Sequence, residues 1–195
     1  SRPSASVDES SGMPWFPAWG IEFSKPIENP SSIVSVFNEW RPSNRWLLLS
    51  YHAACSEVRL WTVWSALRRR EESDRMIART PDAEFLRLVS GTRQLSIAFQ
   101  RAGLSEGDGF AWIVFLPEFT LGEEFGETEV LRSTYSDNDL EATRLIEHLG
   151  VKLLPKRPIP TEEGLIRLGA LENGRTIEPQ SRENAFLTHS ALADM

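Results

Sequence analysis

The sequence is poor in the residue types that carry most metal and redox chemistry. It has a single cysteine, Cys55, so no disulfide can form within the chain, and we expect this residue to be an ordinary buried thiol. The three histidines, His52, His148 and His189, lie far apart, and none belongs to a metal-binding spacing such as HExxH. Phosphate-binding, dinucleotide-binding and nucleophile-elbow motifs are missing as well. We therefore expect no metal, no cofactor and no catalytic residue, although an enzyme with an unfamiliar site stays open.

Long apolar runs are also missing. No run reaches the roughly 20 residues that a membrane-spanning helix needs, and the first residues lack the apolar core of a signal peptide. We expect a cytoplasmic protein with no membrane contact. The hydrophobic content of 41% and the charged content of 25% are typical of a globular domain. The polar residues 1–12 predict a disordered arm, and residues 13–195 predict a single domain.

Charge is unevenly distributed along the chain. The net charge of −7 excludes a uniformly basic nucleic-acid binder. Residues 59–101, however, hold nine Arg and five Asp or Glu, a local net charge of +4 that leaves −11 for the rest. Arg outnumbers Lys by 18 to 3, and Arg suits bidentate phosphate contacts. The basic zone is either an RNA-binding surface or a solvated helical face, and the sequence leaves both interpretations open.

Apolar patterning predicts a small sheet packed with several helices. Two continuous apolar runs, 46–52 and 110–116, predict buried strands. Because strands are few and separated by helices, we expect an α/β (α+β) domain with a mixed sheet. Two further strands are predicted, over 20–25 and 127–134, and residues 152–160 are predicted to be a Pro-rich connection. Helices are predicted over 30–40, 53–72, 81–90, the segment after Gly91, 137–149, a short stretch after Thr161, and from Ser181 to the end.

The most informative segment is 84–103, EFLRLVSGTRQLSIAFQRAG, which predicts two helices that meet at a corner. Gly91 can adopt the positive φ that ends a helix, and Thr92 can cap the next one. Arg93 and Gln94 then project from the corner. Such side chains can bind a phosphate, a splayed base or an RNA hydroxyl. The alternative is that Arg93 pairs with Glu84 or caps a helix end, while Gln94 faces water.

This segment resembles the small accessory subunit of the KEOPS complex, the PRPK-binding protein family in its archaeal-type form. The resemblance is carried by the helix end L-x-S-G-x-R-Q (residues 88–94) and by the amphipathic helix that closes on Gly103-Leu104, set between the two buried strands. It covers somewhat over half of the chain. The Trp- and Pro-rich segment 13–20 and the prolines of 153–161 depart from it.

The resemblance implies a function without catalysis. In the family, this subunit binds a kinase-like ATPase subunit and helps bring tRNA, near its single-stranded 3′ end, to the subunit that makes threonylcarbamoyladenosine. The expected RNA-binding residues are Arg93, Gln94, Arg79, Arg87, Arg68 and Arg69. The expected partner-binding residues are Leu95, Phe99, Val58, Trp61 and Phe186.

Two alternatives remain at this stage. The apolar helix positions, among them the expected partner-binding residues, can simply build a thick helical layer, and Trp61 can pack in the core rather than stack on a base. A purely protein-binding regulator of a kinase-like partner, with no RNA contact, also fits the acidic net charge.

Overall fold

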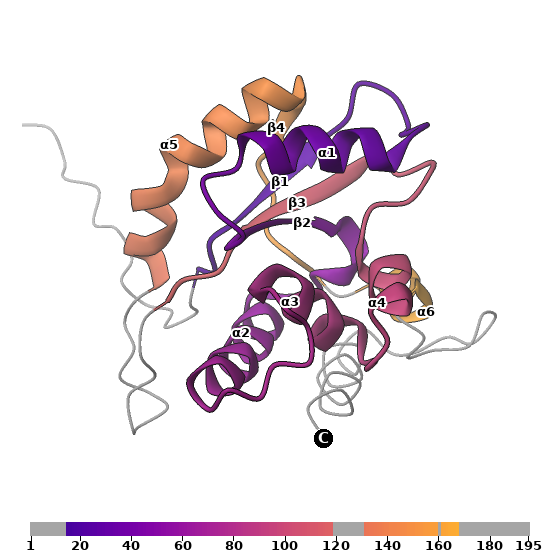
Figure 1. Cartoon of the computed structure of the whole chain (residues 1–195). Coiled ribbons are helices and arrows are strands. Elements are labelled where there is room, and N and C mark those ends of the chain that lie inside the picture. Colours follow the sequence, from indigo (N-terminus) through magenta and orange to yellow (C-terminus); the bar gives the residue numbers. More distant parts are fainter. Residues whose placement is uncertain (1–14, 119–130, 160, 168–195) are drawn as a thin grey trace, which may run out of the picture.

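A four-stranded antiparallel sheet with helices on both faces forms the centre of the protein (Figure 1). The computed structural model describes residues 15–118, 131–159 and 161–167. The strand order is β2-β3-β1-β4. In chain order the elements are β1 (Ala18–Glu22), α1 (Pro30–Trp40), β2 (Trp46–Ser50), the 3₁₀ turn η1 (Tyr51–Ala53), α2 (Glu57–Glu72), α3 (Pro81–Ser90), α4 (Leu95–Ala102), β3 (Phe110–Phe115), α5 (Leu131–Leu149), β4 (Lys152–Leu154) and α6 (Glu162–Arg167).

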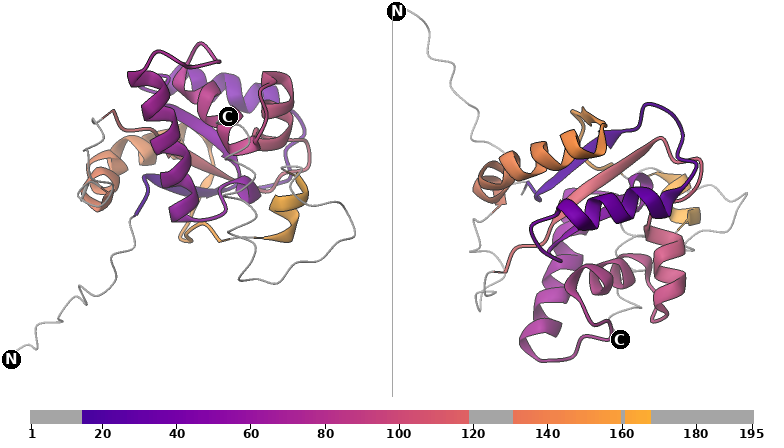
Figure 2. Two further views of the ribbon diagram at one scale, coloured as in Figure 1. Left: turned by 90° about the horizontal axis from the view of Figure 1, so that it is seen from below. Right: turned by 45° about the horizontal axis from the view of Figure 1, so that its top comes forward.

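Helices α2, α3 and α4 cover one face of the sheet, and α1 and α5 cover the other (Figure 2). Alternate strand residues supply the two cores. In β2, Leu47 and Leu49 pack with the α2–α4 layer, whereas Trp46 and Leu48 pack with the α1–α5 layer. Because both faces are buried, β2 and β3 carry continuous apolar runs rather than alternating ones, which is how the sequence revealed them.

The predicted α+β class and small sheet are confirmed, but the direction of the strands is not as expected. Every neighbouring pair is antiparallel, so the sheet is not mixed. The predicted strand 127–134 is wrong over 131–134, which already belong to α5. Tyr135 stacks on the buried Trp19 at a centroid distance of 4.8 Å, so packing on the sheet extends the helix toward its N-terminus. The fourth strand is instead β4, which lies at one edge of the sheet, in the segment predicted to be a connection.

Helix starts follow local capping chemistry. The side chain of Asn29 accepts a hydrogen bond from the Ser32 amide at 3.4 Å, which caps α1 as the sequence predicts. Helix α2 begins at Glu57, four residues later than predicted. The chain first forms η1 and then takes a left-handed conformation at Cys55 (φ 63°), after which the Ser56 hydroxyl accepts from the Arg59 amide at 3.1 Å. Cys55 is a fully buried thiol, as expected.

The Pro-rich connection is anchored by Arg157. Its guanidinium donates to the Glu57 carboxylate at 2.5 Å and to the carbonyls of Phe16 and Ala18 at 2.7 and 2.6 Å. It also lies over the rings of Trp15 and Tyr135, at 4.8 and 5.3 Å from their centroids. The connection is therefore an ordered part of the domain that ties the entry to β1 to the start of α2.

Some predictions fall outside the described residues: the arm 1–12, the helix from Ser181, and Phe186. Within the described segments, no helix combines the length and the apolarity that crossing a bilayer requires.

Candidate nucleic-acid interface

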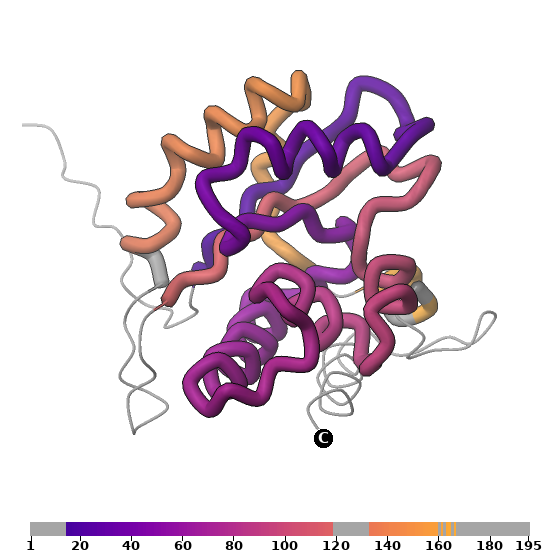
Figure 3. The backbone as a smooth tube through the Cα atoms, in the orientation of Figure 1, coloured from indigo at the N-terminus to yellow at the C-terminus, as the bar shows by residue number. Residues whose placement is uncertain are grey.

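The predicted corner between α3 and α4 is present (Figure 3). Gly91 has φ 69°, and its amide donates to the carbonyls at the end of α3, the arrangement of a left-handed helix cap. Thr92 does not cap α4, contrary to the prediction, because the N-cap position falls on Gln94. The Thr92 hydroxyl instead accepts from the Gln94 amide at 3.2 Å. This bond closes the turn one residue before the helix and fixes the backbone of Arg93.

Arg93 and Gln94 are both exposed at this corner. Within the described part of the chain, neither side chain makes a hydrogen bond or an ion pair. The alternative in which Arg93 pairs with Glu84 is excluded, because Glu84 has 0% exposure and its carboxylate is bound by Arg87 and by the Ala78 amide. The two side chains that the sequence singled out therefore face solvent on a fixed turn.

A buried ion pair lies beneath the corner and corrects one prediction. Arg87 and Glu84 both have 0% exposure and bond to each other through two nitrogens of the guanidinium. Nη1 of Arg87 also donates to the Thr92 carbonyl at 3.3 Å. The sequence predicts that Arg87 contacts RNA, but a side chain enclosed by the core and held by a carboxylate is not available to a phosphate. It supports the corner from inside.

The missed signal is in the sequence of α3. Phe85, Leu86, Leu88 and Val89 are all buried and occupy every side of the helix. A helix that is apolar all round lies inside the protein, so its charged residues must pair with each other. Glu84 and Arg87, three residues apart, satisfy that requirement.

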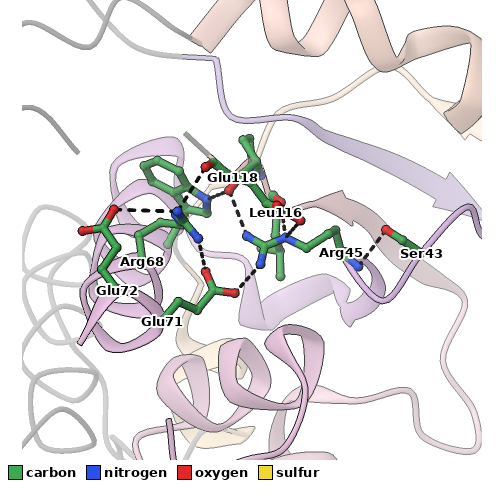
Figure 4. Close-up of polar contacts among 9 residues, drawn as sticks. Ser43, Arg45, Arg68, Glu71, Glu72, Leu116 and Glu118 are labelled. Carbon is green, nitrogen blue, oxygen red and sulfur yellow. Dashed lines mark hydrogen bonds and ion pairs between the residues drawn. The ribbon is translucent and has the colours of Figure 1, made fainter. Parts of the chain in front are cut away.

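Arg68 is also engaged within the protein (Figure 4). Its guanidinium donates to Glu71 at 2.6 Å and to the Glu118 carbonyl at 3.0 Å, and it lies 3.7 Å from Glu72. Glu71 pairs in turn with Arg45, which binds the Leu116 carbonyl at 2.7 Å. Only 12% of the Arg68 side chain is exposed. Its expected role in RNA binding is therefore corrected: it joins α2 to the ends of β2 and β3.

The exposed cations of this layer are fewer than the composition suggested. Arg69 on α2, Arg75 and Arg79 in the loop 73–80, and Arg93 are exposed, and no ion pair within the described segments holds their side chains. Exposed Glu72 and Asp74 lie near Arg69 in the chain and dilute its charge. Arg79 and Arg93, with Gln94, are the predicted RNA-binding residues that remain best placed to contact a phosphate backbone.

The predicted partner residues that lie in the described part of the chain divide between two helices, Val58 and Trp61 on α2 and Leu95 and Phe99 on α4. Trp61 is half-buried and stacks on Trp64 at a centroid distance of 4.7 Å, so most of its surface serves the core. Val58 and Leu95 are also half-buried, whereas Phe99 is 49% exposed. Helix α3 packs against both α2, which carries Val58, and α4, which carries Phe99. Among the described residues of this set, Phe99 is the one large apolar side chain that faces solvent.

One histidine cluster brings together the residue types of a catalytic site. His52 contacts the Thr161 hydroxyl through Nδ1 and the Glu163 carboxylate through Nε2, each at 3.0 Å. That order of groups occurs in nucleophilic catalysis. Here, however, the Thr161 hydroxyl accepts from the Gly164 amide at 3.1 Å, and the Glu163 side chain is 72% exposed. The cluster caps α6 and ties it to η1. Among the described residues, no group of His, Cys, Asp and Glu has the arrangement of a metal site.

Neither the protein-family models nor the curated proteins contain a match to this chain.

Proposed function

We propose that this chain is a non-catalytic accessory subunit of the KEOPS complex, which binds the kinase-like ATPase subunit and helps recruit tRNA for threonylcarbamoylation. The observation that carries the proposal is the α3–α4 corner. It exposes a guanidinium and an amide side by side on a turn whose backbone is fixed by the Gly91 cap and by Arg87. The L-x-S-G-x-R-Q pattern of residues 88–94, which resembles the family, falls on this corner.

The corner has the chemistry that single-stranded RNA requires. Arg93 can donate to a phosphate or stack on a base, and Gln94 can pair with a base edge or a 2′-hydroxyl. Neither residue performs chemistry. The subunit would hold the 3′ end of tRNA while another subunit carries out the reaction, and Arg79 and Arg69 would supply additional charge.

A titration of tRNA by fluorescence anisotropy tests this role. Arg93→Ala should weaken binding about tenfold, the effect of removing one or two charge-assisted hydrogen bonds. Removal of the single-stranded 3′ end should weaken wild-type binding and largely abolish the difference between the two proteins. Arg144→Ala, on the opposite helical layer, is the matched control and should bind as wild type does. An unchanged, measurable affinity of Arg93→Ala would show that the corner is not the RNA site.

Phe99 is the best-placed residue for the kinase-like partner, since it is exposed on α4 beside the corner. Phe99→Glu should reduce co-purification with that subunit, because a charged side chain cannot be buried in an apolar contact without cost. Leu140→Glu is the control, since Leu140 is 80% exposed on α5. Equal loss in both variants would assign the contact elsewhere.

A purely protein-binding regulator is the second candidate. One observation favours it: Arg68 and Arg87, two of the six residues expected to bind RNA, are held in internal ion pairs. The net charge of −7 also favours this candidate, because a negatively charged protein repels the phosphates of RNA. Absence of tRNA binding even at low salt, where phosphate contacts are strongest, would select this candidate.

A further inference from the structure

Two surface loops of the α2–α4 layer are connected through the protein interior. One is the loop 73–80, which carries Arg79, and the other is the corner that carries Arg93. Oε2 of Glu84 accepts a hydrogen bond from the Ala78 amide at 2.6 Å, and Nη1 of Arg87 donates to the Thr92 carbonyl at 3.3 Å. Each of these backbone partners directly precedes an exposed arginine. The Glu84–Arg87 ion pair therefore bridges the two positions from which the cations project.

Stability alone does not account for such a pair. Both side chains have 0% exposure, and removing two charges from water costs about as much as their attraction returns. Apolar residues of similar volume often stabilise a core equally well. What they cannot do is bond to two separate backbone segments at once. The planar guanidinium donates from a fixed fork, so it sets the distance between the groups that it binds.

We infer that the Glu84–Arg87 pair is the positioning element of the nucleic-acid interface: it holds Arg79 and Arg93 in one arrangement, so that both engage a single RNA strand. This inference rests on the proposed function and adds a role for two residues that cannot touch the RNA. A fixed spacing lowers the ordering cost of binding, because the loops need not be immobilised by the ligand.

Arg87→Lys separates positioning from charge balance. The ammonium group of lysine can pair with Glu84, but as a single point charge it cannot reproduce the fork that also reaches Thr92. We expect this variant to fold and to bind tRNA about tenfold more weakly. The slope of log affinity against log salt should fall by about 0.7 for each phosphate of a single strand that the protein no longer neutralises. A merely structural role would lower the unfolding midpoint without changing this slope.

The apolar double variant Glu84→Leu/Arg87→Met provides the second arm, since it leaves no uncompensated buried charge. This double variant should unfold cooperatively. Its tRNA affinity and its slope of log affinity against log salt should fall by as much as those of Arg87→Lys. Its matched control, Glu57→Leu/Arg157→Met, removes the ion pair that anchors the Pro-rich connection and should keep the wild-type slope. Wild-type affinity and slope in folded Arg87→Lys or Glu84→Leu/Arg87→Met would overturn the inference.

Surface variants complete the test without perturbing the core. The side chains of Arg79 and Arg93 are exposed, so the variants Arg79→Ala and Arg93→Ala and the double variant should all fold. If the pair holds the two cations for joint use, the combined loss of affinity is smaller than the product of the single losses. Independent, multiplying effects would contradict the inference but not the proposed function. No effect of Arg93→Ala would instead contradict the proposed function itself.

Discussion

The two helical layers differ in which of their charged side chains are buried and which are exposed. Residues 57–102, which contain α2, α3 and α4, hold nine Arg and six Asp or Glu, whereas α1 and α5 hold two Arg and five acids. In the first layer, Glu57, Glu71 and Glu84 are largely enclosed and paired with arginines, which leaves other arginines exposed. In the second layer most acids face solvent. Which charges are buried, rather than the formal composition, therefore decides the sign that each layer presents.

The largest effect expected from this contrast is on stability. Glu84→Leu should lower the free energy of unfolding by about 3–5 kcal/mol, because it leaves Arg87 charged and unpaired inside the protein. Glu141→Leu, which removes the exposed partner of Arg144 on α5, should change it by about 0.5 kcal/mol or less. Urea unfolding of the two variants measures both values. Similar losses would mean that Glu84 and Arg87 are not enclosed as a pair.

An intermediate effect separates conformational strain from binding. Gly91 (φ 69°) ends α3 and Gly150 (φ 66°) follows α5, so both occupy the left-handed region. Alanine at either position should cost about 1–2 kcal/mol of stability. Only Gly91→Ala should also weaken tRNA binding, because only that turn aims Arg93 and Gln94. Equal affinities of the two alanine variants would count against the corner as the RNA site.

The contrast between the layers also explains which features could be predicted from the sequence. The buried strands β2 and β3 were predicted because burial on both faces leaves an unbroken apolar run, a purely local signal. The corner was predicted because Gly91 supplies a conformation that other residues avoid. These features depend on a few neighbouring residues and on no distant contact.

Other features depend on tertiary contacts that no local pattern contains. The Arg68 side chain is enclosed because Glu71 and the end of β3 meet it, and Glu118 lies 50 positions further along the chain. The edge strand β4 exists because it pairs with β1, although its three residues lie in a Pro-rich segment. A count of arginines treats Arg68, Arg87 and Arg93 alike. The apolar pattern of α3 indicates that Arg87 is enclosed, whereas only the fold shows that Arg68 is held inside the protein.

The smallest expected effect is on the pH dependence of stability, and it has opposite signs in the two layers. Burial, reinforced by Asp139, raises the pKa of Tyr135 on α5 above its usual value of 10.0. The folded state then retains its proton more tightly than the unfolded state, so this stabilisation is present below pH 10 and is lost as the pH rises further. Burial lowers the pKa of Arg59 on α2 from its usual value to about 10. The contribution of Arg59 to stability therefore has the opposite sign: the folded state releases this proton before the unfolded state does, so the folded state gains stability as the pH rises above about 10.

Urea midpoints measured from pH 8 to pH 11 should separate these two contributions. The urea midpoint of Tyr135→Phe should decline less steeply with pH than that of the wild type above pH 10, because this variant lacks the phenol whose ionisation the fold disfavours. The urea midpoint of Arg59→Met should decline more steeply, because this variant lacks the stability that the folded wild type gains when Arg59 loses its proton. The variants are compared by the slope of the urea midpoint against pH. A general loss of stability in either variant shifts all its midpoints and leaves this slope unchanged. Identical slopes in all three proteins would show that neither group titrates differently in the folded and unfolded states, and the opposition between the layers would then not extend to proton binding.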